Sequence, residues 1–214
     1  FGIGFASFSE TGNAKPLVLT GGCGFQLRAT RSSIKTEDYP LTTPIFLYLP
    51  ARRLPALGRD FMRYVRSDAA QLVVRRAGFV DQAPELIPVG RQGDRLANAI
   101  LSADTASDLA DLRRMTVRLA KMRRLTTSFR FEVGSARLDA QSRSNVLALA
   151  RSLEAGDHDG RMLSFVGFSD GRGAASVNLG IARKRAEAVR DAVLAAAEAA
   201  DLGRDRAREH VVLQ

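Results

Sequence analysis

A strand–loop–helix segment at residues 166–189 constrains the fold of this chain more than any other stretch. It begins at the end of a short apolar run, residues 162–168, which is typical of a buried strand. A polar loop follows at residues 169–173, and its two glycines allow a tight turn. A run rich in Ala, Arg and Lys then predicts a helix over about residues 176–200. The segment therefore predicts an α/β unit.

Arg185 interrupts the apolar side of the predicted helix. At about 100° per residue it falls between Ile181 and Val189, and Asn178 lies on the same side. A guanidinium on a buried side costs several kcal/mol if it stays unpaired, so it needs an anionic partner. Asp170, in the loop that leads into the helix, is the nearest candidate by sequence. We therefore expect Asp170 and Arg185 to face one notch at the strand–loop–helix junction.

Two interpretations of this pair are open. In the first, Asp170 and Arg185 form an internal salt bridge that only fixes the loop. In the second, the notch binds a zwitterion: Asp170 pairs with an ammonium group and Arg185 with a carboxylate, through charge-assisted hydrogen bonds. The spacing of the two residues fits both interpretations.

The pattern G-F-S-D-x-x-G, with Asn eight residues after the Asp and then I-A-x-x-R-A-x-x-V, resembles the signature of the OmpA-like peptidoglycan-binding domain. Residues 131–138 resemble that family's first strand and turn, and the resemblance covers residue 126 to the end. The signature positions that match are Gly167, Asp170, Gly173, Asn178, Arg185, Ala186 and Val189. The fold that this resemblance implies is a βαβα-type sandwich of helices on a small mixed sheet.

The resemblance implies that Asp170 and Arg185 hold the diaminopimelate side chain of the peptidoglycan stem peptide. That side chain ends in one free amine and one free carboxylate, which suits the notch. Asn178, Ser169 and Gly171 are the further candidate peptidoglycan-binding residues. The resemblance thus predicts non-covalent attachment to the cell wall, in the periplasm or at the outer membrane.

The sequence departs from the family pattern at three positions. Phe168 replaces the usual His, Ser169 the usual Thr, and Ala182 the usual Ser. The exchange of Thr for Ser keeps a hydroxyl group. The family domain also continues with a glycine-rich turn, an arginine-bearing loop and a last strand, beyond residues 210–214 with which this sequence ends, so a complete sheet is not predicted.

The first part of the chain predicts a second α/β segment. Apolar runs predict three strands, at residues 1–9, 17–19 and 44–50. Helical spacing of apolar residues predicts helical structure over residues 57–76, and Ser67 with Asp68 predicts a new helix start within it.

This order of elements resembles the C-terminal portion of phosphate-type substrate-binding proteins of ABC importers. The resemblance covers residues 1–88 and implies a partial type II periplasmic-binding-protein-like α/β lobe. It implies a partner, phosphate or another oxyanion, but no ligand residue can be assigned here. The residues that carry it are Phe1–Phe5, Tyr39–Leu41, Ile45–Tyr48, Phe61–Ser67, Ala70–Gln71 and Gly78–Val80.

Residues 89–125 are predicted to form a linker and a connecting helix, between the segment 1–88 and the OmpA-like segment 126–214. The helix is predicted over residues 104–125 and has a basic end. Two interpretations are open: a solvated face, or a basic arm that touches anionic envelope polymer or lipid headgroups. The basic residues are Arg113, Arg114, Arg118, Lys121, Arg123 and Arg124.

Charge and composition narrow the function classes. The net charge of +9 divides into +4, +4 and +1 over the three segments, so the basicity lies outside the OmpA-like part. Only four of the 32 basic residues are Lys, there is no Trp, and no nucleic-acid-binding motif occurs, so we expect no nucleic-acid partner. No run of eighteen apolar residues is present, so we expect no transmembrane segment.

Catalytic and metal signals are weak. His158, between two Asp residues, is expected to be solvated, and no second cluster of metal ligands is spaced to help it. Cys23 has no His nearby, and no nucleophile elbow or phosphate loop occurs. We expect a binding protein without a cofactor, not an enzyme.

Two functions follow from these observations. The first is a module that binds peptidoglycan and anchors a periplasmic solute-binding module to the cell wall. The second is an importer component that captures phosphate or another oxyanion, with the OmpA-like domain as a passive tether.

Overall fold

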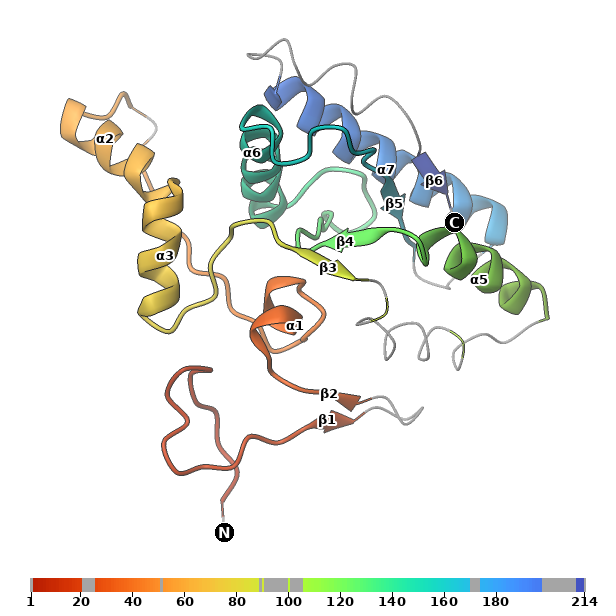
Figure 1. The fold of residues 1–214 in the computed structure, drawn as a ribbon, viewed down its shortest axis with the longest axis horizontal. Coiled ribbons are helices and arrows are strands. Elements are labelled where there is room, and N and C mark those ends of the chain that lie inside the picture. Colours follow the sequence, from red (N-terminus) through yellow and green to blue (C-terminus); the bar gives the residue numbers. More distant parts are fainter. Residues whose placement is uncertain are drawn as a thin grey trace. The chain divides into compact units, whose positions relative to one another are not determined.

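The structure is a computed structural model that describes residues 2–20, 26–50, 52–88, 90, 100, 106–169, 174–197 and 211–213 (Figure 1). The chain divides into two compact units. The first comprises Phe1–Ser102 with Arg124–Thr126, and the second comprises Ala103–Arg123 with Thr127–Gln214.

The first unit holds short strands and short helices. Antiparallel pairing joins β1 to β2, and β3 forms a second two-stranded sheet with β4. The N–H of Thr126 donates to the carbonyl of Glu85 (2.9 Å), which extends that second sheet. The elements are β1 (Leu19–Thr20), β2 (Gln26–Leu27), α1 (Arg31–Lys35), α2 (Ala56–Val65), α3 (Asp68–Arg76), β3 (Leu86–Pro88) and β4 (Arg123–Leu125), whose first residue is assigned to the second unit.

The helical structure predicted for residues 57–76 is confirmed, and so is the predicted start of a new helix at Ser67. Its hydroxyl accepts a hydrogen bond from the N–H of Ala70 and so caps α3, because the first N–H groups of a helix have no partner within it. One further sequence prediction is corrected: residues 104–125 are not one helix, since α5 (Ala106–Leu119) ends before β4.

The predicted strands at residues 1–9 and 44–50 are wrong. The described residues of both runs have no regular structure, and Ile3, Phe5 and Tyr48 are at least 90% exposed. A strand needs a neighbouring strand for its backbone hydrogen bonds, and no strand within the described residues pairs with either run. The third prediction, at residues 17–19, is reduced to β1. Apolar composition alone therefore did not produce strands here.

The second unit is a small α/β unit, as predicted. The strands β5 (Phe165–Gly167) and β6 (Val211–Leu213) pair in parallel, and α7 (Ala175–Ala197) contacts both of them as well as α6 (Ala140–Glu154). Figure 1 draws α7 as the longest helix of the unit, alongside β5. The buried core residues are Val146, Leu149, Ala150, Phe165, Ala182, Ala186, Val189 and Val193.

Candidate functional site

Gly167, at the end of β5, lets the strand touch the backbone of α7. A β-carbon at this position would overlap the carbonyl oxygen of Ala182 and lie 3.2 Å from the amide nitrogen of Ala186. Ala182 and Ala186 are themselves 0% and 3% exposed, so small residues line both sides of this contact. The close approach brings the end of β5 and Phe168, the residue after it, next to the turn of α7 that carries Arg185.

A hairpin at residues 130–139 forms a second wall of the site. Phe131 and Leu138 make an isolated antiparallel bridge, and the N–H of Glu132 donates to the carbonyl of Arg137 (2.9 Å). Gly134 has a φ of +68° in the turn, a conformation that residues with a side chain rarely adopt. The predicted first strand of this segment is therefore reduced to a bridge.

Helix α6 fixes the base of this hairpin. The Asp139 carboxylate accepts a hydrogen bond from the N–H of Ser142 (2.7 Å) and caps the helix. The buried hydroxyl of Ser142 accepts in turn from the N–H of Arg130 (2.6 Å). The Asn145 amide donates to the carbonyl of Ser128 (2.8 Å). These bonds hold the hairpin to the helix at its start and at its end.

The side chain of Arg185 extends from α7 to the hairpin turn at Ser135 and to Phe168, the residue after β5. Its Nε donates to the carbonyl of Ser135 (3.4 Å), and its Nη1 donates to the carbonyl of Phe168 (3.2 Å). The guanidinium carbon lies 5.1 Å from the centre of the Phe131 ring, a cation–π distance. The side chain is half-buried on the same side of the helix as Ala182 and Val189, which agrees with the helical spacing in the sequence.

The partners of Arg185 in the described part of the chain are all uncharged. They are two backbone carbonyls and one aromatic ring, and no carboxylate of the described residues forms an ion pair with it. The guanidinium has five N–H donors, and two of them are used in these bonds. Three donors are therefore left for a further acceptor, and the positive charge is not neutralised by any of these contacts.

The other predicted site residues fall into two groups. Ser169 and Asn178 are half-buried, the first just after β5 and the second in the first turn of α7. Asp170 and Gly171 lie outside the described residues, as do Cys23 and His210. The pairing of Asp170 with Arg185 therefore stays a prediction.

The first unit contains a charge cluster that sequence reasoning missed. The Lys35 ammonium lies 2.8 Å from Asp81 and 2.7 Å from Glu85, and Arg75 lies 3.1 Å from Asp81. Arg31 also pairs with Glu85. The side chains of Lys35 and Asp81 are 4% and 0% exposed. No local signal in the sequence could find the pairs made by Arg31 and Lys35, because these residues lie about fifty residues from Asp81 and Glu85.

The electrostatics of this cluster favour a structural role. Burial raises the pKa of Asp81, but hydrogen bonds and charges from Arg75 and Lys35 outweigh it and lower the pKa to about 2. Burial likewise raises the pKa of Glu85, and Lys35 and Arg31 shift it below its usual value. The hydrogen bond to Asp81 raises the pKa of Arg75. Every charged group of the cluster thus has a partner of opposite sign within the protein.

The prediction that His158 is solvated is wrong. The residue is 6% exposed, and its Nε2 lies 3.1 Å from the hydroxyl of Ser152. Burial lowers the pKa of His158, Asp157 opposes this shift, and Arg161 adds to it. The Ser152 hydroxyl donates its hydrogen to the Asp157 carboxylate (2.7 Å), so His158 does not accept it and the hydroxyl is not activated. The turn after α6 folds back on the helix and buries the ring.

Two further observations concern the described residues as a set. They include no group of three or more His, Cys, Asp or Glu side chains that could hold a metal ion. Across the same residues, no helix combines the length and the apolar composition that crossing a membrane requires.

Comparison with known proteins supports the C-terminal resemblance. A model of the OmpA family matches residues 130–201, a range that contains the hairpin, α6, β5 and α7. Neither a curated protein nor a solved structure matched the chain. The comparisons give no support to the resemblance of residues 1–88 to substrate-binding proteins. The OmpA-like part of the prediction is thus confirmed, and the phosphate partner has no support.

Proposed function

We propose that the C-terminal unit binds peptidoglycan non-covalently and that Arg185 pairs with a carboxylate of the diaminopimelate in its stem peptide. The match to the OmpA family supports the general part of this proposal, since OmpA domains are associated with peptidoglycan binding. The observation that carries the specific part is the guanidinium of Arg185, which is held in place by uncharged partners in the described structure.

The contacts of Arg185 suit it to bind a carboxylate. Its bonds to Ser135 and Phe168 hold the guanidinium plane before a ligand arrives, which reduces the entropy lost on binding. The three free donors lie in the planar fork that matches the two oxygens of a carboxylate. A charge-assisted pair of this kind is about twice as strong as a neutral hydrogen bond.

The ammonium side of the ligand is assigned to the loop after β5. In this proposal the Asp170 carboxylate accepts hydrogen bonds from the protonated free amine of diaminopimelate. Ser169 and Asn178, which flank that loop, and Gly171 within it complete the contacts. Recognition of both charges selects a zwitterionic side chain over a singly charged one.

The proposed cellular role is attachment to the cell wall in the periplasm. Binding by the C-terminal unit would hold the first unit at the wall. We assign no solute to that first unit.

Sedimentation of the protein with isolated peptidoglycan tests the site. We expect Arg185→Ala to reduce binding at least tenfold, because a charge-assisted pair is worth about 1.5–3 kcal/mol. Arg183→Ala is the matched control: Arg183 is exposed on the same helix and pairs with Glu187 (2.9 Å), so its loss should leave binding unchanged. Unchanged circular dichroism would show that both variants keep their fold.

Peptidoglycan with Lys in place of diaminopimelate tests the pairing of Arg185 with the carboxylate separately from peptidoglycan binding as such. Lys lacks the second carboxylate, so binding should fall to the level of Arg185→Ala. Equal binding to both polymers, or full binding by Arg185→Ala, would refute the role of Arg185. Absence of sedimentation with either polymer would refute peptidoglycan binding itself.

A further inference from the structure

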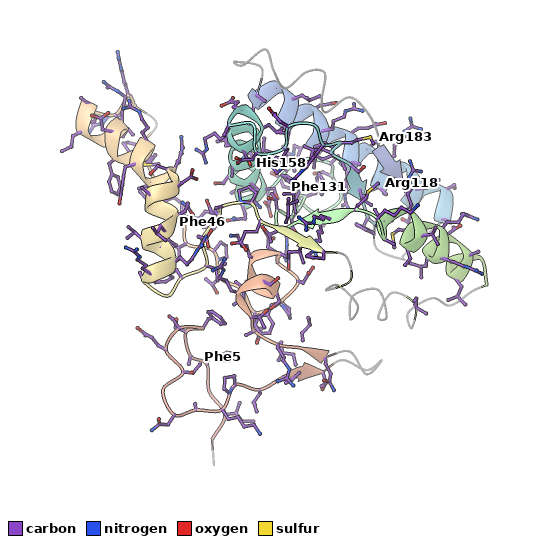
Figure 2. The ribbon with its side chains drawn as sticks, in the orientation of Figure 1. Phe5, Phe46, Arg118, Phe131, His158 and Arg183 are labelled. Atoms are coloured by element: carbon purple, nitrogen blue, oxygen red, sulfur yellow. The ribbon has the colours of Figure 1, made fainter. Side chains whose placement is uncertain are left out.

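The outward side of α5 and the turn after it carry a group of cations that we call the basic face: Arg113, Arg114, Arg118 and Lys121. All four are exposed, and Figure 2 shows Arg118 beside α5. Arg114 pairs with Asp111. The other three members form no ion pair with any residue that the structure describes, so their charges are not neutralised there.

The placement of the basic face follows from helical spacing. Arg113, Val117 and Lys121 are four residues apart and form one row along α5 and the turn after it, and Arg114 with Arg118 forms the next row. The opposite side is more enclosed, with Met115 only 6% exposed. The helix therefore presents one charged side and one enclosed side.

Apolar side chains lie within this charged surface. Val117, in the row between Arg113 and Lys121, is 67% exposed, and Leu109, one turn before Arg113, is 45% exposed. Aliphatic side chains between cations suit a lipid surface, where the cations meet headgroup phosphates and the aliphatic groups enter the boundary with the acyl chains. Sites for single-stranded nucleic acid add aromatic side chains on which bases stack, and this face has no aromatic residue.

We propose that the basic face of α5, with Val117 at its centre, binds the anionic headgroups of a phospholipid membrane surface. The contact lies in a plane along the helix and does not span the membrane. It is separate from the notch at Arg185 and does not depend on peptidoglycan binding. The full chain would then have two attachment points of different chemistry.

Co-sedimentation of the 214-residue chain with vesicles tests the proposal. The probes are neutral phosphatidylcholine vesicles and vesicles with about 30% phosphatidylglycerol. We expect binding only to the anionic vesicles, and loss of most binding between about 0.1 M and about 0.5 M salt, since salt screens exposed charges. The triple variant Arg113→Gln/Arg118→Gln/Lys121→Gln should weaken partitioning on the order of a hundredfold.

Two further variants make the result specific. Lys15→Gln/Arg66→Gln/Arg76→Gln removes the same charge from exposed positions outside α5 and should change partitioning by less than about threefold. Val117→Asp should weaken vesicle binding, because it removes an aliphatic group and adds a repelled charge.

Three outcomes would overturn the proposal. The first is equal binding of the wild-type chain to neutral and anionic vesicles, or binding to neither. The second is equal loss of binding in the α5 triple variant and in its control. The third is tight, salt-dependent binding to duplex DNA that the α5 variant abolishes, with no vesicle binding, which would reassign the face to nucleic acid.

Discussion

Each of the two units places a cation away from water, but they treat its charge in opposite ways. In the first unit, Lys35 is 4% exposed and lies within 2.8 Å of two carboxylates, Asp81 and Glu85. In the second unit, Arg185 is half-buried and its described partners are the carbonyls of Ser135 and Phe168 and an aromatic ring.

The difference separates a structural charge from one that is available to a ligand. A buried charge is tolerated only when opposite charges and hydrogen bonds compensate it, and the cluster around Lys35 meets this requirement internally. Carbonyls and a ring orient a guanidinium but leave its charge in place. The comparison therefore predicts that loss of Lys35 affects folding, whereas loss of Arg185 affects binding.

The largest effect is expected for Lys35→Met. It leaves Asp81, whose side chain is 0% exposed, with Arg75 as its remaining cation, and breaking a buried pair costs about 3–5 kcal/mol of unfolding free energy. Urea unfolding followed by tyrosine fluorescence measures this, since all three tyrosines (Tyr39, Tyr48 and Tyr64) belong to the first unit.

A double variant controls for the buried charge. Lys35→Met/Asp81→Leu removes both members of the pair, and it should unfold at a higher urea concentration than Lys35→Met, because no unpaired carboxylate is then buried. Peptidoglycan binding should be unchanged in both variants. An equal loss in the single and the double variant would contradict a structural ion pair.

The second-largest effect is expected where Gly167 of β5 touches the backbone of α7, beside Arg185. Gly167→Ala places a methyl group against the backbone of Ala182, which cannot move away as a flexible side chain could. Overpacking costs about 1–3 kcal/mol and often more against backbone. Circular dichroism at increasing urea should show earlier loss of helix, while the tyrosine transition of the first unit stays in place. Unchanged helix stability would contradict the close approach of β5 and α7.

The sequence predicted the parts of the site that depend on local spacing. The position of Arg185 on the inward side of α7 follows from its four-residue distance to the buried Val189, whereas Ile181, predicted on the same side, is 37% exposed; β5 and α7 follow in the predicted order. Its partners could not be predicted, because the carbonyl of Ser135 lies fifty residues away and backbone carbonyls have no sequence signature.

Features that depend on contacts between residues far apart in the chain could not be predicted from the sequence. The pairing of Lys35 with Asp81 joins α1 to the segment after α3, and nothing in either stretch specifies the other. The burial of His158 does not follow from the sequence, because two flanking Asp residues are typical of a solvated turn, whereas the ring lies against Ser152 and is buried. The runs at residues 1–9 and 44–50 have strand composition but no pairing strand in the described structure.

The third prediction concerns the unfolding free energy of the first unit at acidic pH. Because the pKa of Asp81 is about 2 in the folded protein and its ordinary value is 3.8, the unfolded state binds more protons between these two pH values. The stability from Asp81 is thus present above about pH 4 and lost as the pH falls through about 2, a change of about 2 kcal/mol. The tyrosine-detected unfolding free energy should fall over this range.

Asp81→Asn provides the control for that titration. Its stability should be lower at neutral pH and should fall less between about pH 4 and about pH 2, because the titrating group is absent. The depressed pKa of Glu85 leaves some pH dependence in the variant. An unchanged acid profile in Asp81→Asn would show that other carboxylates control the acid transition, and it would weaken the contrast between the two units.

The smallest effect tests what holds Arg185 in place. Phe131→Leu removes the ring 5.1 Å from the guanidinium, and a cation–π contact at a partly exposed site is worth about 0.5–1 kcal/mol. If the ring orients the charge for a carboxylate, peptidoglycan affinity should fall about two- to fivefold. Phe131→Tyr keeps the ring and should bind as the wild type does. Equal affinity of the Leu and Tyr variants would show that the two carbonyls alone orient Arg185, and the available charge would then depend on the loop backbone rather than on the ring.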